Sequence, residues 1–252
     1  MKEQNISRRG FLQLALIVPL ATLKLPELGR NLEGTSERIP GVIYEFKTFK
    51  PEYAVTVDDC FYPDQLVATL DALKKDKIQA TFFIVGNGAI YCEQKVPGIV
   101  QRLVDEGHYL AYHTMGHDSI EKLSSVGVEW FRQDYQKWEE HIKKYLRPDS
   151  FGAIKPWARA PWGLFNSTFM QLCKEKDLAA FFWSADEGTL SRRIPLKKGD
   201  IILFHARATS VEWISKLRDI STLSPAPMDS FMEPQFNEQE RLRLEYRLNR
   251  IR

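Results

Sequence analysis

Short apolar segments alternate with amphipathic segments from about Tyr53 to His205, and this pattern restricts the fold more than any other feature of the chain. Because strands and helices that alternate along a chain build mostly parallel sheets with helices outside, we expect an α/β fold. We predict helices after Pro63, over 99–104, over 128–145, over 165–172 and over 210–220. We predict strands over 54–57, 81–85, 109–112, 179–183 and 201–204.

Polar side chains follow several of the predicted strands directly. Because α/β barrels carry their chemistry at the C-terminal ends of their strands, such side chains can meet in one site. Four successive segments of this kind are hard to attribute to chance. The residues are Asp58 and Asp59, then His113 and His117, then Arg159, and finally His205.

His113 and His117 are four residues apart, so on one helical turn both imidazoles would face the same way. Two histidines and a carboxylate leave open positions on a divalent metal, as a catalytic site requires. A lone histidine pair is more often placed on a surface or in a core, and an Asp-Asp turn is common after strands. Because the histidines also follow a strand and can share a face with the aspartates, the combination favours a hydrolytic metal site.

The length and composition fit one large domain. The chain has 252 residues, a hydrophobic content of 44% and a net charge of +2, and it lacks a basic run interleaved with aromatics. We therefore expect no nucleic-acid partner. The three cysteines form no CxxC pair and suggest no disulfide framework. Cys60, beside the aspartate pair, is either partly exposed near the site or simply a small residue at a tight turn.

Residues 1–35 are expected to be a targeting segment and linker. The segment Ser7-Arg8-Arg9-Gly10-Phe11-Leu12 resembles a twin-arginine export signal, and the apolar run after it is too short for a bilayer span. We therefore expect an exported protein, periplasmic or at the cell surface. No clear cleavage site follows, so an uncleaved membrane anchor stays an alternative. We expect the catalytic domain at 36–223 and a charged tail at 224–252, with helical character from 237, that is either solvated or in contact with anionic cell wall or lipid.

The motif order Asp-Asp, His-x-x-x-His, Arg-x-Pro-x-Gly and Leu-x-His resembles the polysaccharide deacetylases with a NodB-homology domain, also called carbohydrate esterase family four. The similarity covers about three-fifths of the chain. It implies a distorted (β/α) barrel that removes acetyl groups from sugars. It also implies a divalent metal cofactor, with zinc as the expected ion, and a polysaccharide or oligosaccharide as the partner.

The resemblance also implies a role for each matching residue. Asp59, His113 and His117 would bind the metal, Asp58 would be the general base and Arg159 would hold Asp58 ionised and oriented. The remaining assignments are Pro161 and Trp162 in the turn whose backbone N–H at Trp162 stabilises the oxyanion, Leu203 in the acetyl pocket, and His205 as the general acid.

Three features depart from the family pattern. Cys60 stands where the family usually has glycine. The aspartate that tunes the catalytic histidine has no counterpart: Thr189 falls at its position, and Asp186 or Glu187 is a weaker substitute. The usual last strand is reduced at best to residues 220–223.

The favoured function is an exported, metal-dependent deacetylase of an amino-sugar polymer such as peptidoglycan or a chitin-like glycan. An O-acetyl esterase of the xylan type and a small-molecule amide hydrolase would use the same site. A catalytically weak carbohydrate-binding relic is the alternative from another class. A serine or cysteine hydrolase is disfavoured, because the chain has no GxSxG elbow.

Overall fold

A curled parallel sheet forms the centre of the protein in the computed structural model, which describes residues 38–232. The strand order is β1-β6-β5-β4-β3-β2-β8-β7, and β9 pairs with β2. This arrangement confirms the predicted distorted barrel. The strands are β1 (Val42–Ile43), β2 (Glu52–Asp59), β3 (Ala80–Ile84), β4 (Tyr109–Tyr112), β5 (Ile154–Ala158), β6 (Ala179–Phe181), β7 (Ala185–Asp186), β8 (Ile201–His205) and β9 (Ser224–Pro225).

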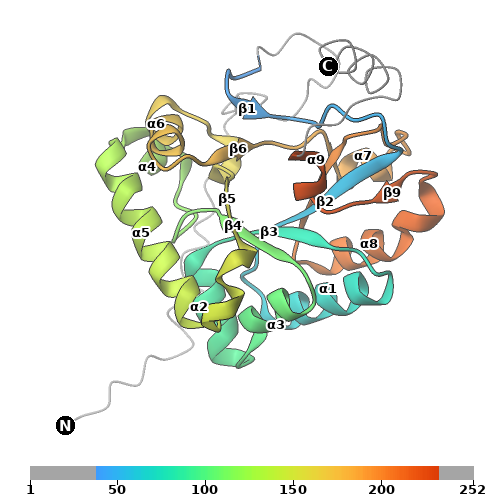
Figure 1. Ribbon diagram of the computed structural model, residues 1–252, viewed down its shortest axis with the longest axis horizontal. Coiled ribbons are helices and arrows are strands. Elements are labelled where there is room, and N and C mark those ends of the chain that lie inside the picture. Colours follow the sequence, from blue (N-terminus) through green and yellow to red (C-terminus); the bar gives the residue numbers. More distant parts are fainter. Residues whose placement is uncertain (1–37, 233–252) are drawn as a thin grey trace, which may run out of the picture. The chain divides into compact units, whose positions relative to one another are not determined.

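Helices surround the sheet (Figure 1). Helix α1 begins with Pro63 at its first turn and buries Leu66, Leu70 and Leu73, as its apolar spacing predicts. The helices are α1 (Pro63–Lys75), α2 (Gly86–Lys95), α3 (Ile99–Asp105), α4 (Ile120–Ser125), α5 (Val128–Lys144), α6 (Ser167–Glu175), α7 (Glu187–Ser191), α8 (Ala208–Ile220) and α9 (Asp229–Met232), with 3-10 turns η1 (Pro148–Ala153) and η2 (Pro161–Gly163).

The two faces of the sheet carry separate apolar clusters. Val55 and Val57 of β2 join the larger cluster, to which the helices contribute, whereas Ala54 joins a smaller one with Phe83, Trp157 and others. Because successive strand side chains point to opposite faces, the second set lies inside the curl of the sheet. The same alternation places Asp58, His113, Arg159 and His205 on the inner face, at or just past the C-terminal ends of their strands.

The two edge strands, β1 and β7, do not pair with each other in residues 38–232. Backbone contacts near these edges join the ends of the sheet instead. Glu45 forms an isolated antiparallel bridge with Asp200, and the Phe46 N–H donates to the Gly199 carbonyl at 2.8 Å. Gly199 has φ +83°, and a Cβ atom there would lie 1.9 Å from the Phe46 oxygen. Only glycine fits this crossing.

Residues 224–232 belong to the folded domain, so the predicted boundary at 223 is too early. Strand β9 pairs with the start of β2, and Phe231 stacks on Phe46 with ring centroids 4.6 Å apart. The Tyr109 hydroxyl donates to Asp229 of α9. The proposed last strand at 220–223 is also wrong: Ile220 ends α8, and the strand begins at Ser224.

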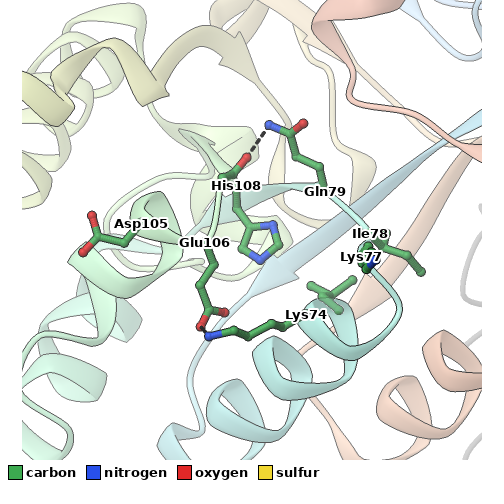
Figure 2. A pocket seen from close by; sticks show the side chains of 9 residues that line it. Lys74, Lys77, Ile78, Gln79, Asp105, Glu106 and His108 are labelled. Atoms are coloured by element: carbon green, nitrogen blue, oxygen red, sulfur yellow. Dashed lines mark hydrogen bonds and ion pairs between the residues drawn. The ribbon is translucent and has the colours of Figure 1, made fainter.

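A cavity of about 410 Å³ lies at the opposite end of the strands from the aspartates and histidines, at the N-terminal ends of β3 and β4 (Figure 2). The His108 ring is buried there, and its Nδ1 accepts a hydrogen bond from the Ala80 N–H at 3.1 Å. Burial lowers the pKa of His108 to about 4. The lining residues are Leu73, Lys74, Lys77, Ile78, Gln79, Asp105, Glu106, Gly107 and His108.

The N-terminal targeting prediction and the helical part of the tail lie outside the described residues. Between residues 38 and 232, none of the helices has the length and apolar character needed to cross a bilayer.

Candidate active site

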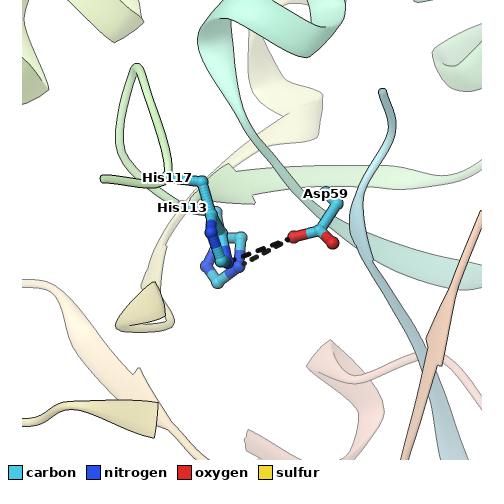
Figure 3. A group of neighbouring side chains, drawn as sticks. All are labelled: Asp59, His113 and His117. Carbon is cyan, nitrogen blue, oxygen red and sulfur yellow. Dashed lines mark ion pairs between the residues drawn. The ribbon is translucent and has the colours of Figure 1, made fainter. Parts of the chain in front are cut away.

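Asp59, at the C-terminal end of β2, forms a cluster with His113 and His117, which follow β4 (Figure 3). The Asp59 Oδ1 atom lies 3.5 Å from Nε2 of His113 and 3.4 Å from Nε2 of His117. All three ligand atoms lie within 4.8 Å of one another. Burial alone would raise the pKa of Asp59, but the adjacent His113 ring and the rings of His117 and His205 outweigh it and lower that pKa to about 2. The aspartate is therefore ionised at neutral pH.

This donor set fits a divalent metal ion. Asp59 Oδ1 is buried and has no hydrogen-bond partner among the described residues, although buried carboxylate oxygens are normally paired. His113 Nδ1 lies 2.8 Å from the Arg159 carbonyl, so Nδ1 carries the proton and the Nε2 lone pair faces Asp59. The two Asp59–histidine distances of 3.5 and 3.4 Å would allow one divalent ion to be held by all three donors.

The segment from His113 to His117 is a loop, so the predicted helical turn is wrong. Thr114 and His117 have φ angles of +64° and +50°, and the loop is tied to the start of α2 by its backbone. The Gly86 and Asn87 N–H groups donate to the carbonyls of Thr114 and Met115 at 3.0 and 2.8 Å. Both imidazoles nevertheless reach Asp59, because the turns of this loop bring them to the same side.

Asp134 of α5 supports the histidine loop and was not anticipated. Its carboxylate accepts hydrogen bonds from the Tyr112 hydroxyl at 2.5 Å and from the Met115 N–H at 3.0 Å. Burial raises the pKa of Asp134 to about 6, against the effect of these donors. The signal was present in the sequence: a single carboxylate interrupts the apolar stripe between Phe131 and Trp138.

Asp58 and Arg159 form a buried ion pair next to the cluster. The Arg159 Nη1 lies 2.6 Å from Asp58 Oδ1, and the guanidinium also donates to Thr56 and to the carbonyls of Phe181 and Phe182. Burial lowers the pKa of Arg159, whereas Asp58 opposes that effect. The second carboxylate oxygen of Asp58 lies 3.7 Å from His113 Nε2, on the side of the metal cluster.

The turn after β2 aims the two carboxylates in different directions. Asp59 and Cys60 have φ angles of +73° and +67°, a left-handed conformation that side chains disfavour by roughly 1–2 kcal/mol each. Cys60 is fully buried, so of the two alternatives the small residue at a tight turn is observed and partial exposure is not. Gly88 of α2 packs on this turn, where an added Cβ would lie 2.8 Å from the Cys60 carbonyl.

His205 lies on the other side of Asp59. Its Nε2 is 4.0 Å from Asp59 Oδ2, and Nη2 of Arg207 is 3.8 Å from the same oxygen. Asp59 therefore turns Oδ1 to the two clustered histidines and Oδ2 to His205 and Arg207. Asp59 is also the one carboxylate within 4.0 Å of the His205 ring nitrogens in the described part of the chain.

Neither Asp186 nor Thr189 replaces the missing aspartate. Asp186 caps α7 and accepts from the N–H and hydroxyl of Thr189, so the two residues satisfy each other. Glu187 instead accepts from the Ser210 hydroxyl, and the Ser210 oxygen accepts from the His205 N–H at 3.2 Å. The Glu187 carboxylate is therefore connected to the backbone N–H of His205 through the Ser210 hydroxyl.

The predicted substrate-binding residues lie around the same site. Trp162 has φ +61°, is 55% exposed and donates from its indole nitrogen to the Asp118 carbonyl at 2.9 Å. Its ring contacts His117 edge-on, with centroids 4.6 Å apart. Pro161 is buried at the start of η2, and Leu203 is buried two residues before His205 on β8. Strand alternation places Leu203 on the same face as His205.

Residues 47–181, more than half of the chain, match the family model described as polysaccharide deacetylase. Two curated relatives resemble the chain at about 30% identity. A chitooligosaccharide deacetylase from Sinorhizobium fredii is 29% identical over 63% of this chain and 73% of the relative. A peptidoglycan-N-acetylglucosamine deacetylase from Bacillus cereus is 30% identical over 54% of this chain, which spans 46% of that relative.

The fold is shared with solved structures at lower identity. One is a pseudoenzyme of carbohydrate esterase family 4 from Bacillus anthracis, with a TM-score of 0.62 and 18% identity. The superposition covers 78% of this chain and 70% of the pseudoenzyme. Taken with the family match over residues 47–181, the parallel barrel and the order of the motifs show that the chain belongs to the polysaccharide deacetylase family, carbohydrate esterase family 4.

Proposed function

We propose that the protein is an exported, zinc-dependent hydrolase that removes acetyl groups from the N-acetylated sugars of a polysaccharide. The observation that carries the proposal is the convergence of Asp59 Oδ1 and the Nε2 atoms of His113 and His117 beside the buried Asp58–Arg159 pair. A divalent metal held by the first three residues supplies a Lewis acid that polarises the acetyl carbonyl and lowers the pKa of water. The chain's own residues supply the remaining steps.

Asp58 is the proposed general base. Its Oδ2 is free of the Arg159 contact and lies on the metal side, where it can accept the proton of the attacking water. Arg159 uses its donors on Asp58, Thr56 and two carbonyls, so it keeps the carboxylate in one orientation. A carboxylate fixed in this way keeps its second oxygen pointed at the metal cluster, where the proton is to be taken.

His205 is the proposed general acid. Amide cleavage requires a proton on the departing sugar amine, and a histidine ring nitrogen is a group that can donate one. The His205 side chain is 32% exposed and lies across Asp59 from the two metal-binding histidines. His205 on β8 is the register partner of Asp58 on β2, so the proposed acid and the proposed base come from adjacent strands and approach the reacting carbon from separate positions.

Trp162 and Leu203 complete the proposed substrate site. The left-handed conformation at Trp162 belongs to the turn whose N–H would stabilise the developing oxyanion, a contribution worth about 3 kcal/mol in other enzymes. The exposed indole offers a stacking surface for a sugar ring, and Tyr62, also exposed, follows the aspartate turn. Leu203 offers an apolar wall for the acetyl methyl group.

The substrate class follows from the relatives and is part of the proposal. The two curated relatives are named as deacetylases of chitooligosaccharides and of peptidoglycan N-acetylglucosamine, and the second name specifies an N-acetylated amino sugar. Export is supported by the Ser7-Arg8-Arg9-Gly10-Phe11-Leu12 segment, and an uncleaved segment would leave the enzyme at the membrane surface. Replacing Arg8 and Arg9 by lysine should retain the protein in the cytoplasm, which fractionation would measure.

Acetate release from chitin oligomers, peptidoglycan and acetylated xylan tests the function. The full chain is loaded with zinc and assayed with and without a chelator. Chelator-sensitive release from the first two substrates supports the N-deacetylase. Release from xylan alone supports the O-acetyl esterase instead.

A catalytically weak sugar-binding protein is the second candidate. Within residues 38–232, no carboxylate other than Asp59 lies within 4.0 Å of the His205 ring nitrogens, which favours this candidate. In addition, a pseudoenzyme occurs among proteins of the same fold. Saccharide binding without acetate release by the zinc-loaded protein would select it.

A further inference from the structure

Arg207 holds a guanidinium at the edge of the active site. It lies between His205, at the end of β8, and Ala208, at the start of α8. Its N–H donates to the His205 carbonyl at 2.7 Å, which fixes the backbone two residues from the proposed general acid. The Nη2 atom lies 3.8 Å from Asp59 Oδ2, and the side chain is 57% exposed. One nitrogen of the guanidinium therefore lies beside the active site, and more than half of the side chain is exposed to solvent.

The neighbouring acidic residues leave this charge available. Glu187 is bound to the hydroxyls of Ser210 and Thr209 in the first turn of α8, and it forms no ion pair with Arg207. Asp59 is the one carboxylate within 4.0 Å of Arg207 in the described part of the chain, and its other oxygen faces His113 and His117. A contact of 3.8 Å is too long for a hydrogen bond, so the guanidinium donors remain uncommitted.

The two arginines of the site differ in what they can do. Arg159 is fully buried and donates to protein oxygens on every side, so a ligand cannot reach it. Arg207 has the opposite character, with exposed donors and no hydrogen-bonded acceptor on its side chain among residues 38–232. A planar guanidinium with free N–H groups matches a carboxylate through two parallel hydrogen bonds.

The charges of the site favour an anionic ligand group beside Arg207. Asp58 is balanced by Arg159 at 2.6 Å, and Asp59 would be balanced by the metal that its residues fit. Arg207 is then an additional positive charge with no counter-ion of its own. A neutral glycan would leave this charge to solvent, whereas a carboxylated glycan would pair with it.

We propose that Arg207 is a substrate-binding residue that recognises a carboxylate on the sugar chain, so that the preferred substrate is an N-acetylated amino sugar with a carboxylate near its acetamido group. This inference rests on the proposed deacetylase function and refines its substrate class. Arg207 contacts the substituent and not the reacting amide, so its loss should raise KM for carboxylated substrates and leave kcat nearly unchanged.

A pair of matched glycans tests this recognition. One is a strand of alternating N-acetylglucosamine and N-acetylmuramic acid with free lactyl carboxylates, and the other is the same strand with those carboxylates converted to methylamides. The wild-type protein should prefer the free acid by about tenfold in kcat/KM, the scale of a charge-assisted hydrogen bond at an exposed site. Arg207→Gln should reduce the preference to about twofold or less, and Arg207→Lys should restore part of it.

Arg147→Gln is the matched control, because the Arg147 side chain is 56% exposed and its partner Asp105 lies at the end of α3. This variant should keep the wild-type preference. Equal preference in wild-type protein and Arg207→Gln would overturn the proposal. So would an effect of Arg207→Gln confined to inhibition by acetate, because the cation would then hold the product rather than a substituent.

Equilibrium binding separates this proposal from the deacetylase function. Calorimetry with zinc-loaded Asp58→Asn protein, which should turn over slowly, and the two strands should show tighter binding of the free acid, lost when Arg207→Gln is added and weakened by salt. If the protein hydrolyses neither strand but keeps this binding preference, the function fails and the role of Arg207 stands. If it hydrolyses both strands equally and binds them equally, the function stands and the role of Arg207 is overturned.

Discussion

Asp58 and Arg159 are 101 residues apart in the chain, and their side chains meet at 2.6 Å inside the barrel with almost no exposure to solvent. Neither charge is stable there alone, because a buried ion without its partner carries a desolvation cost of several kcal/mol. The pair therefore links the end of β2 to the end of β5, and it orients the proposed base.

Arg159→Ala should destabilise the fold by about 3–5 kcal/mol, because Asp58 would remain buried without a counter-charge. Urea unfolding at pH 7 measures the loss. Arg132→Ala is the control: Arg132 pairs with Glu175 on the surface, and an exposed pair contributes less than about 1 kcal/mol. Equal losses in the two variants would show that the buried pair has no special importance.

Mutation of the two adjacent aspartates should have different effects, because Asp58 is the proposed general base and Asp59 is a proposed metal ligand. Asp58→Asn should lower acetate release by about 10²- to 10⁴-fold while zinc affinity is kept, because Asp58 is assigned to proton transfer. Asp59→Asn should lower zinc affinity itself, because Oδ1 is one of the three converging donors. Zinc titration with a competing chelator measures both, and circular dichroism checks that each variant folds. Loss of zinc in Asp58→Asn would contradict the division of roles.

Asp134→Asn should weaken zinc binding by about 10- to 100-fold, the usual effect of removing a group that holds a ligand in place. Its Oδ1 accepts from both Tyr112 and the Met115 N–H, and its Oδ2 accepts from the same N–H, so the asparagine NH2 group in place of Oδ2 would set a donor against the Met115 N–H. Asp118→Asn serves as the comparison, since its exposed pair with Lys122 lies next to the same loop. Unchanged zinc affinity in Asp134→Asn would mean that the loop keeps its shape without the carboxylate.

Glu187→Gln should lower kcat by between about tenfold and a hundredfold, with zinc affinity unchanged. The carboxylate accepts the Ser210 hydroxyl and so leaves the Ser210 oxygen free for the His205 N–H. An amide can donate to Ser210 instead, and a small displacement of the acid is costly in rate. Asp186→Asn alters the same helix without touching Ser210, so a larger effect from that variant would refute this coupling.

His108 should make the protein less stable below neutral pH. Burial lowers the pKa of His108 from 6.5 to about 4, so the unfolded chain takes up a proton that the folded state rejects. The stabilising contribution is complete above pH 6.5 and is lost as the pH falls through 4, by up to about 3 kcal/mol. Urea unfolding between pH 7.5 and 4.5 measures this slope.

His108→Asn is the variant for that comparison, because its carbonyl oxygen can replace Nδ1 as the acceptor of the Ala80 N–H. The variant should show a smaller loss of stability on acidification than the wild type. A slope as steep as that of the wild type would assign the acid sensitivity to other groups.

The amino-acid sequence determined the barrel and the chemistry of its open end. Apolar runs as short as 54–57 and 201–204 are recognisable because strands buried on both faces carry few polar residues. The residues that follow them in the chain must then gather at one end of a parallel sheet. This reasoning was enough to predict that Asp58, Asp59 and Arg159 lie in one site with the three histidines.

Tertiary structure decided the features that depend on contacts between distant segments. The histidine spacing predicted a helical turn, but hydrogen bonds donated by Gly86 and Asn87 and accepted by Asp134 hold a loop with left-handed residues instead. The spacing of residues along the chain cannot predict such hydrogen-bond partners, because they belong to other helices. The pairing of residues 224–225 with β2 was not predicted for the same reason.

The exposure of Arg207 is likewise a property of the fold rather than of a motif. In the sequence it is one basic residue among many, two positions after a recognised histidine. Only the arrangement of β8, α8 and the aspartate turn leaves its guanidinium beside Asp59 while Glu187 is bound elsewhere. Sequence patterns indicate which side chains a helix or strand presents on each face. Whether a charged side chain is free to bind a ligand depends on its neighbours in the folded protein, because these can already occupy its hydrogen-bond donors.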